Sequence, residues 1–143
     1  GEGMPLGIGA AIGSGGRKTV ILTGDGGLNF NLGELWTAIQ EGIDAVIIVM
    51  NDYGYGVIKH IQDATCEGRR FYCDLQGPDF GSLAKLAGIP FWKVSTETLL
   101  EEAVKHALEV KGLALVEVDM NSIGEIPRYF PYGSKIRNSK PAA

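Results

Sequence analysis

The stretch KTVILTGDGGLNFN, residues 18–31, sets an apolar run against a glycine-rich turn that carries one carboxylate. The run at 18–23 predicts a short buried strand, because it is partly β-branched and is bounded by glycine. Asp25 would then lie at the carboxyl end of that strand, between Gly24 and Gly26. A tight turn explains this pattern, but so does a backbone that approaches a phosphate while the carboxylate binds the phosphate's metal. A second ligand elsewhere in the chain is needed to choose between the two.

Apolar strand patterns alternate with helical ones along the rest of the chain. This alternation predicts an α/β fold with a doubly wound, mostly parallel sheet and helices on both faces. Asn31 is expected to cap the first helix after the glycine-rich turn, with Glu34 as its capping-box partner. Strands are predicted at 18–23, 45–50, 91–95 and 114–120. One helix is predicted at 32–41, a second begins at about residue 57, a third follows Pro78, and a fourth spans 97–110. A loop is predicted at 63–77.

Composition limits the classes of function. The chain has 143 residues and a net charge of −4, so no nucleic-acid partner is expected. No apolar run approaches the roughly 20 residues that span a bilayer, and no membrane association is expected. Cys66 and Cys73 have neither zinc-site spacing nor nearby histidines, which favours free thiols in a reducing cytoplasm.

The second carboxylate is Asp52, in the segment VMNDYGYGV that follows the strand at 45–50. One strand–helix–strand unit fits between Asp25 and Asp52, so the two would lie side by side if their strands are neighbours. Two carboxylates that close repel each other unless a cation lies between them. Oxygen ligands without sulfur favour Mg²⁺, which combines one or two carboxylates with phosphate oxygens and water. The glycines around both carboxylates would leave backbone N–H groups free for a phosphate.

The combined pattern resembles a known family. GDG followed by an Asn-Asp pair, Asn51 and Asp52, is similar to the signature of thiamine diphosphate enzymes. The chain resembles the C-terminal, diphosphate-binding domain of the acetolactate synthase and pyruvate decarboxylase group. GMPLGIGAAIG and GPDFGSLAKLAG resemble further segments of that domain, and the resemblance covers roughly residues 1–120. The dinucleotide-binding fingerprint fits less well, because GDGGLN lacks its third glycine.

The resemblance implies a site of thiamine diphosphate and Mg²⁺. Asp25, the side chain of Asp52 and the main-chain carbonyl of Gly54 would bind the metal. The family often carries Asn at position 52, and the extra charge here still suits Mg²⁺. Asn51 would stabilise the metal ligands without binding the metal itself. The residues expected to contact the cofactor are Gly24, Asp25, Gly26, Gly27, Asp52, Gly54, Tyr55, Gly56 and Val57.

The resemblance also implies that part of the active site lies elsewhere. The family's catalytic glutamate, which activates the cofactor's pyrimidine ring, belongs to a separate pyrimidine-binding domain, usually on a partner subunit. No catalytic residue is therefore assigned in this chain. Residues 1–122 are expected to form the cofactor-binding domain without its N-terminal part, and 123–143 a tail. The full-length protein is expected to be a cytoplasmic homo-oligomer, and this chain alone is expected to be inactive.

Three functions remain open from the residues. The first is acetolactate synthase-like C–C bond formation after decarboxylation of a 2-oxo acid. The second is simple decarboxylation or C–C cleavage, because Val57 and Ile61 stand where synthases usually carry a methionine and a tryptophan. The third is a non-catalytic domain that binds a nucleotide phosphate.

Several other side chains are assigned structural roles. Lys59 could attract an anionic substrate, but a solvated position is favoured. Trp36 is expected to pack in the core or between helices. The helix at 97–110 is expected to bury one apolar stripe, which contains Leu99, Leu100, Ala103, Val104, Ala107 and Leu108.

Overall fold

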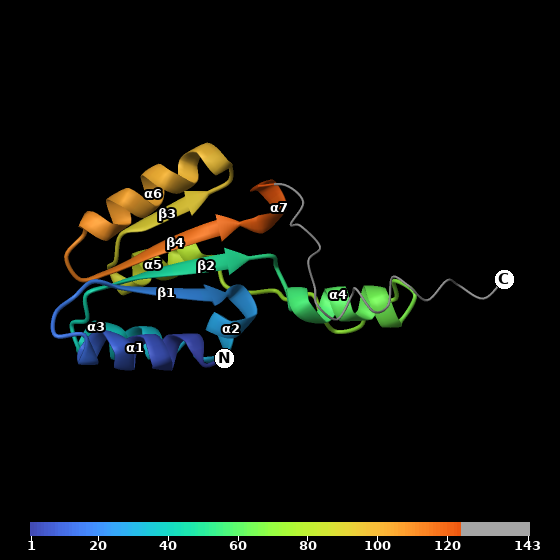
Figure 1. The fold of residues 1–143 in the computed structure, drawn as a ribbon, viewed down its shortest axis with the longest axis horizontal. Helices are drawn as coiled ribbons and strands as arrows, with labels where there is room; N and C mark the ends of the chain where they lie inside the picture. Colours follow the sequence, from blue (N-terminus) through green and yellow to red (C-terminus); the bar gives the residue numbers. More distant parts are fainter. Residues whose placement is uncertain (124–143) are drawn as a thin grey trace.

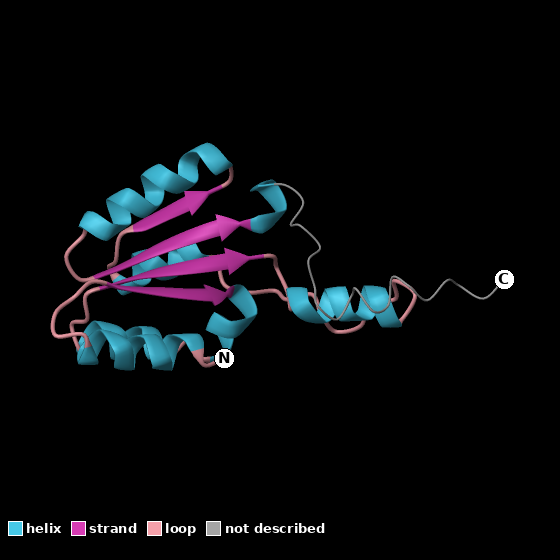
Figure 2. Ribbon diagram, viewed as in Figure 1, coloured by secondary structure: helices cyan, strands magenta, loops and turns pink. Residues whose placement is uncertain are grey.

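The computed structural model describes residues 1–123, which form a four-stranded, all-parallel sheet (Figures 1 and 2). The strand order is β1-β2-β4-β3, so the first two strands of the chain are neighbours and the last strand lies between β2 and the edge strand β3. This confirms the predicted fold class. The strands are β1 Thr19–Gly24, β2 Ala45–Asn51, β3 Phe91–Val94 and β4 Leu113–Asp119.

Helices cover both faces of the sheet. On one face, α1, α3 and α5 pack on a core that includes Ile21, Ile47 and Leu115. On the other face, α6 packs through Ala103 and Ala107 on a second core. The helices are α1 Gly3–Gly13, α2 Asp25–Phe30, α3 Glu34–Gln40, α4 Gly56–Thr65, α5 Phe80–Ala87, α6 Glu97–Glu109 and α7 Met120–Ile123.

The burial of each strand follows its place in the sheet. Every residue of the central strand β4 is buried, as expected for a parallel strand covered on both faces. The edge strand β1 alternates instead, because Ile21 points into the core below α1 while Val20 and Leu22 are about half or more exposed. A Cβ on Gly7 of α1 would lie 2.5 Å from the Ile21 side chain, so glycine lets α1 pack closely against β1.

The chain around Asn31 differs from the prediction. The glycine-rich turn is itself a short helix, α2, which begins at Asp25. Asn31 ends α2 and its side chain donates to the carbonyl of Gly1, so it does not cap the next helix. α3 begins only at Glu34, after Gly33. The predicted helix 32–41 and its capping box are therefore wrong at the N-terminal end, while Gly42 ends the helix with a positive φ as expected.

The predicted loop at 63–77 also requires correction, since α4 continues to Thr65. α4 projects from the end of the sheet, and none of its residues is buried (Figure 1). The chain that follows is tied back to α4 by hydrogen bonds. Gln62 exchanges two with the backbone of Phe71, at 3.0 and 2.7 Å, and Arg70 donates two to Asp63, both at 2.7 Å.

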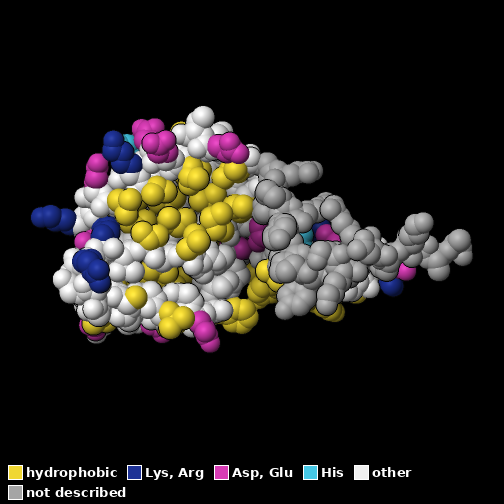
Figure 3. Space-filling model, viewed as in Figure 1, with side chains coloured by type: hydrophobic (Ala, Val, Ile, Leu, Met, Phe, Trp, Pro, Cys, Tyr) yellow, Lys and Arg dark blue, Asp and Glu magenta, His cyan; other side chains and the backbone are white. Residues whose placement is uncertain are grey.

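Part of one sheet face is open, and Figure 3 shows hydrophobic side chains gathered there. α6 covers that face over β3 and β4 and leaves Val20 and Leu22 of β1 exposed. The expected buried stripe on α6 is only partly formed, because Leu99, Leu100 and Leu108 remain 37–43% exposed. Trp36 is 45% exposed, so the expectation of a core position is wrong.

Among residues 1–123, no helix combines the length and the apolar character needed to cross a membrane. The predicted tail at 123–143 lies outside the described residues except for Ile123, which ends α7.

Candidate functional site

The two candidate metal ligands lie just past the carboxyl ends of neighbouring strands. Gly24, the last residue of β1, is in register with Met50 of β2, so Asp25 and Asp52 follow at the same edge of the sheet. Asp25 is 2% exposed, and its Oδ2 accepts a hydrogen bond of 2.9 Å from the N–H of Gly54. The structure thus brings Asp25, Asp52 and Gly54 together, as the sequence predicted.

The electrostatics of this site favour a bound cation. Burial raises the pKa of Asp25, and the nearby carboxylate of Asp52 raises it further. Hydrogen bonds from the backbone of Gly26 and Gly54 oppose this rise without cancelling it. A positive ion between the two carboxylates would replace their repulsion with attraction. The ligand set of two carboxylates and a main-chain carbonyl therefore fits a hard divalent ion such as Mg²⁺.

Glycine is required at several positions because other groups lie against the backbone. A Cβ on Gly26 would lie 2.8 Å from the ring of Tyr55. A Cβ on Gly56 would collide with the carboxylate of Asp52, and one on Gly54 with the carbonyl of Cys73. These close approaches explain why both loops are rich in glycine.

The first turn of α4 presents the most suitable backbone groups for a phosphate. No side chain caps this helix, and its first turn carries no acidic residue, so the N–H groups of Gly56 and Val57 have no cap from a side chain. The N–H of Tyr55 donates to the carbonyl of Cys73 at 2.8 Å, and that of Gly54 to Asp25. The predicted cofactor contacts of Tyr55 and Gly54 would therefore come from groups other than their amides.

Lys59 is not the solvated side chain that the sequence favoured. Its side chain is 13% exposed, and its ammonium donates to the main-chain carbonyls of Asp52 at 3.0 Å and Tyr53 at 3.3 Å. It also pairs with Asp74 at 3.2 Å. Lys59 thus ties α4 to the loop that carries Asp52.

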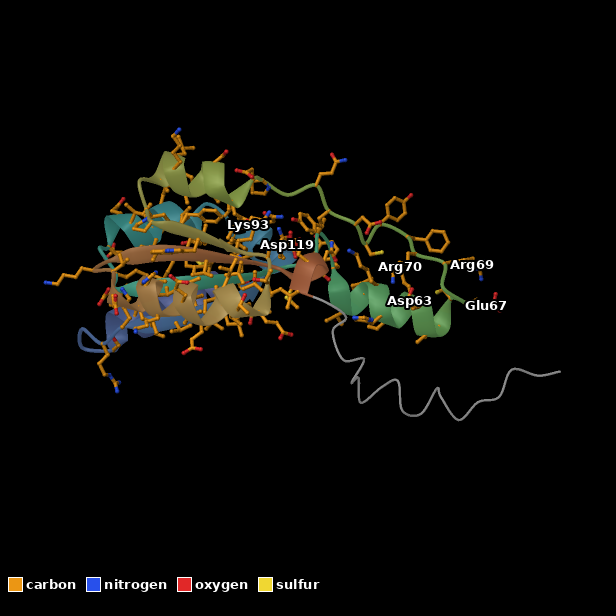
Figure 4. All side chains as sticks on the ribbon, turned by 90° about the horizontal axis from the view of Figure 1, so that it is seen from above. Asp63, Glu67, Arg69, Arg70, Lys93 and Asp119 are labelled. Atoms are coloured by element: carbon orange, nitrogen blue, oxygen red, sulfur yellow. The ribbon has the colours of Figure 1, made fainter. Side chains whose placement is uncertain are left out.

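A polar cluster beside this loop was missed in the sequence. Asn51 donates to Glu117 at 2.8 Å, and Tyr53 Oη donates to Asp119 at 3.2 Å. The side chains of Glu117 and Asp119 are 5% and 13% exposed, and Lys93 lies 3.6 Å from Glu117 and 3.8 Å from Asp119 (Figure 4). The signal was present in VEVDM, because two acidic residues within a predicted strand of a sheet covered by helices require partners.

Comparison with known proteins agrees with this geometry. Residues 1–118 match the family described as "Thiamine pyrophosphate enzyme, C-terminal TPP binding domain". The chain belongs to this family. The acetolactate synthase large subunit of Haemophilus influenzae is 35% identical over 132 residues, which are 92% of this chain and 23% of that protein. Benzoylformate decarboxylase of Pseudomonas aeruginosa is 30% identical over 123 residues, 86% of this chain and 23% of the enzyme.

A solved relative shows the same fold. The thiamine diphosphate-dependent 4-hydroxybenzoylformate decarboxylase of Rhodococcus jostii RHA1 superposes with a TM-score of 0.75 at 32% identity. The match covers 87% of this chain and 23% of that enzyme. The chain therefore spans about a quarter of the length of these thiamine diphosphate enzymes.

Within residues 1–123 no group of three or more His, Cys, Asp or Glu side chains could hold a metal ion by itself. A metal at Asp25 and Asp52 would thus need oxygens from the backbone and from a ligand. Mg²⁺ bound with a diphosphate has this coordination.

Proposed function

We propose that this domain binds the diphosphate of thiamine diphosphate through Mg²⁺, as part of an enzyme that acts on 2-oxo acids. The observation that carries the proposal is the pairing of Asp25 and Asp52 at the ends of neighbouring parallel strands, joined by the hydrogen bond from Gly54 to Asp25. A turn alone does not account for two carboxylates beside each other with the pKa of one of them raised.

Each residue near the carboxylates has a defined task in this proposal. The side chains of Asp25 and Asp52 and the carbonyl of Gly54 bind the metal. Gly24, Gly26 and Gly27 let the cofactor approach the end of β1. The N–H groups of Gly56 and Val57 bind phosphate oxygens, and the positive end of the α4 dipole adds to this attraction.

The bound cofactor would supply an electron sink for the carbanion that forms when a 2-oxo acid loses CO₂. The residues of this chain would anchor and orient it, and we assign the catalytic glutamate to none of them. Glu34, Glu101 and Glu102 lie on α3 and α6, in the helical layers away from the Asp25 loop. We propose that residues 1–122 work with a separate pyrimidine-binding domain that provides the catalytic glutamate, in a homo-oligomer.

Two reaction types are consistent with the relatives. The relatives include an acetolactate synthase and two decarboxylases of 2-oxo acids. A synthase-like reaction is supported by the 35% identity to the Haemophilus influenzae protein. Decarboxylation is favoured at two positions on α4. Val57 and Ile61, which are 53% and 42% exposed, are smaller than the residues expected in a synthase.

Product analysis of the intact protein tests these alternatives. The protein is incubated with Mg²⁺, thiamine diphosphate and either pyruvate or benzoylformate, and the products are identified. Acetolactate from pyruvate supports the synthase, whereas acetaldehyde or benzaldehyde supports a decarboxylase. Absence of CO₂ release from a panel of 2-oxo acids, by a protein shown to bind the cofactor, would contradict both.

A further inference from the structure

We propose that Tyr53 is a positioning residue for the metal site: its hydroxyl, held by Asp119, fixes the backbone between the two metal ligands Asp52 and Gly54. This inference rests on the proposed function, because it concerns the same site. It assigns a purpose to the polar cluster of Asn51, Tyr53, Lys93, Glu117 and Asp119, which no step of the proposed function uses.

The contacts of Tyr53 come from both ends of the residue. Its side-chain hydroxyl donates to Asp119 Oδ2 at 3.2 Å, and its backbone N–H donates to the side-chain oxygen of Asn51 at 3.1 Å. Asn51 is in turn held by Glu117 at 2.8 Å. Tyr53 is thereby connected to two residues of β4, a strand in the middle of the sheet.

The backbone of Tyr53 needs such support. Its φ is +56°, in the left-handed region that a bulky side chain rarely adopts. This turn of the chain directs the side chain of Asp52 toward Asp25 and places the N–H of Gly54 on Asp25. Without the bond to Asp119, a return of Tyr53 to a negative φ would lower the backbone's conformational free energy. Asp52 and Gly54 would then move apart.

The charges of the cluster are arranged for anchoring. Glu117 and Asp119 are 4% and 9% exposed, so each would be costly without partners. Lys93 approaches both carboxylates from the neighbouring strand β3, and Figure 4 shows Lys93 and Asp119 close together at the end of the sheet. Asp119 is therefore a fixed acceptor for the Tyr53 hydroxyl, with the ammonium of Lys93 beside it. Hydrogen bonds to charged acceptors are stronger than neutral ones.

The effect on metal binding follows from preorganisation. If only a fraction of molecules holds Asp52 and Gly54 in place, the apparent metal affinity falls by that fraction. Tyr53 is 40% exposed and lies outside both hydrophobic cores, so its hydroxyl contributes little to global stability. A positioning role and a purely structural role thus predict different results, the first in metal affinity and the second in melting temperature.

The experiment measures Mg²⁺ affinity by calorimetry at saturating thiamine diphosphate, together with the melting temperature of the apoprotein. The intact protein is compared with Tyr53→Phe, Asp119→Ala and the double variant. Tyr53→Phe should raise the Kd for Mg²⁺ about tenfold, the order expected for one hydrogen bond to a charged acceptor. Its melting temperature should change by no more than about 2 °C. The double variant should bind Mg²⁺ no more weakly than the single variant with the higher Kd, because the two substitutions remove the same hydrogen bond.

Two controls separate the explanations. Tyr72→Phe removes a hydroxyl from a tyrosine that is 99% exposed, and its Kd should equal that of the wild type. Lys18→Met removes a buried ammonium at the opposite edge of the sheet, so it should lower the melting temperature without changing the Kd. An unchanged Kd in Tyr53→Phe, or an equal loss of affinity in Lys18→Met, would overturn the positioning role. Failure of the wild type to bind Mg²⁺ and thiamine diphosphate would instead contradict the proposed function.

Discussion

At the scale of single residues, Asp25 meets two opposing requirements. It is buried and close to Asp52, which raises its pKa and disfavours its ionised form in the absence of a cation. A metal ligand must be ionised, however. The residue is therefore suited to a metal-bound state, and Mg²⁺ with thiamine diphosphate should raise the melting temperature of the wild-type protein.

The two carboxylates should not be equivalent under substitution. Asp25→Ala removes a buried ligand and the acceptor of the Gly54 N–H, so Mg²⁺-dependent cofactor binding should weaken by about a hundredfold or more. Asp52→Asn keeps an oxygen that can coordinate, and we expect a loss within about tenfold. Calorimetry on both variants, with folding checked by circular dichroism, would count against the assignment if Asp25→Ala bound normally.

The place of the two carboxylates at one edge of the sheet could be predicted from the sequence, because each follows a strand of clear apolar character. Asp25 and Asp52 are found by their place after 18–23 and 45–50. Tyr53 and Asp119 were not linked, because nothing in a linear pattern indicates that β4 lies beside β2 and not at the edge. The contacts of Lys59 could not be predicted for a similar reason, since its partners include main-chain carbonyls.

At the scale of elements, the strands were predictable and the helix boundaries were less so. β2 has a continuous apolar sequence that fits a strand buried on both faces. α2 was missed because glycine is a poor helix former, and here tertiary contacts override that preference. The close approach of Gly26 to Tyr55 and of Gly27 to Thr23 shows why glycines stand in this helix.

The amino-terminal edge of the sheet carries a stabilising contact that can be tested by pH. Lys18 donates to Asp44 at 2.6 Å and to the carbonyl of Gly112 at 3.0 Å. The hydrogen bond from Lys18 holds the pKa of Asp44 below its usual value. The unfolded chain then binds a proton at higher pH than the folded protein does. The contribution of Asp44 is therefore complete above about pH 5 and is lost as the pH falls below about 4.

Lys18→Met should lower the free energy of unfolding by about 1–2 kcal/mol at pH 7, because it leaves buried acceptors without a donor. Urea unfolding at several pH values provides the measurement. The difference in free energy of unfolding between the wild type and Asp44→Asn should shrink toward pH 3. A difference that grew on acidification would be inconsistent with this contact.

The arm formed by α4 and the chain up to Gly77 depends on a small number of hydrogen bonds. Hydrogen exchange can test the order of segment 63–77 residue by residue. The Phe71 amide, which donates to Gln62 at 2.7 Å, should be the better-protected group of this segment. Gln62→Ala should remove that protection, whereas Arg69→Ala, which changes an exposed side chain, should preserve it. Equal exchange in all three proteins would show that the contact does not order the arm.

At the scale of the whole molecule, the domain has a core on each face of its sheet, and we propose that a separate domain completes the active site. Two hydrophobic cores fill the space on either side of the sheet. Apolar side chains remain 42–65% exposed on the open sheet face, at Val20 and Leu22, and on α4, at Val57, Ile58 and Ile61. The 143-residue chain should therefore fold by itself and release no CO₂ from 2-oxo acids with saturating Mg²⁺ and thiamine diphosphate. Sustained turnover by the purified chain would show that it contains the whole catalytic apparatus.

The central claim is that Asp25 and Asp52 hold a Mg²⁺ ion that binds the diphosphate of thiamine diphosphate. The most direct measurement is calorimetric titration of the intact protein with thiamine diphosphate, with Mg²⁺ present and with the metal removed by a chelator, alongside ATP and NAD. Our account predicts saturable binding of thiamine diphosphate that requires Mg²⁺, and much weaker binding of either nucleotide. Thiamine diphosphate binding that is equally tight without metal, or tight binding of ATP or NAD with no response to thiamine diphosphate, would contradict it.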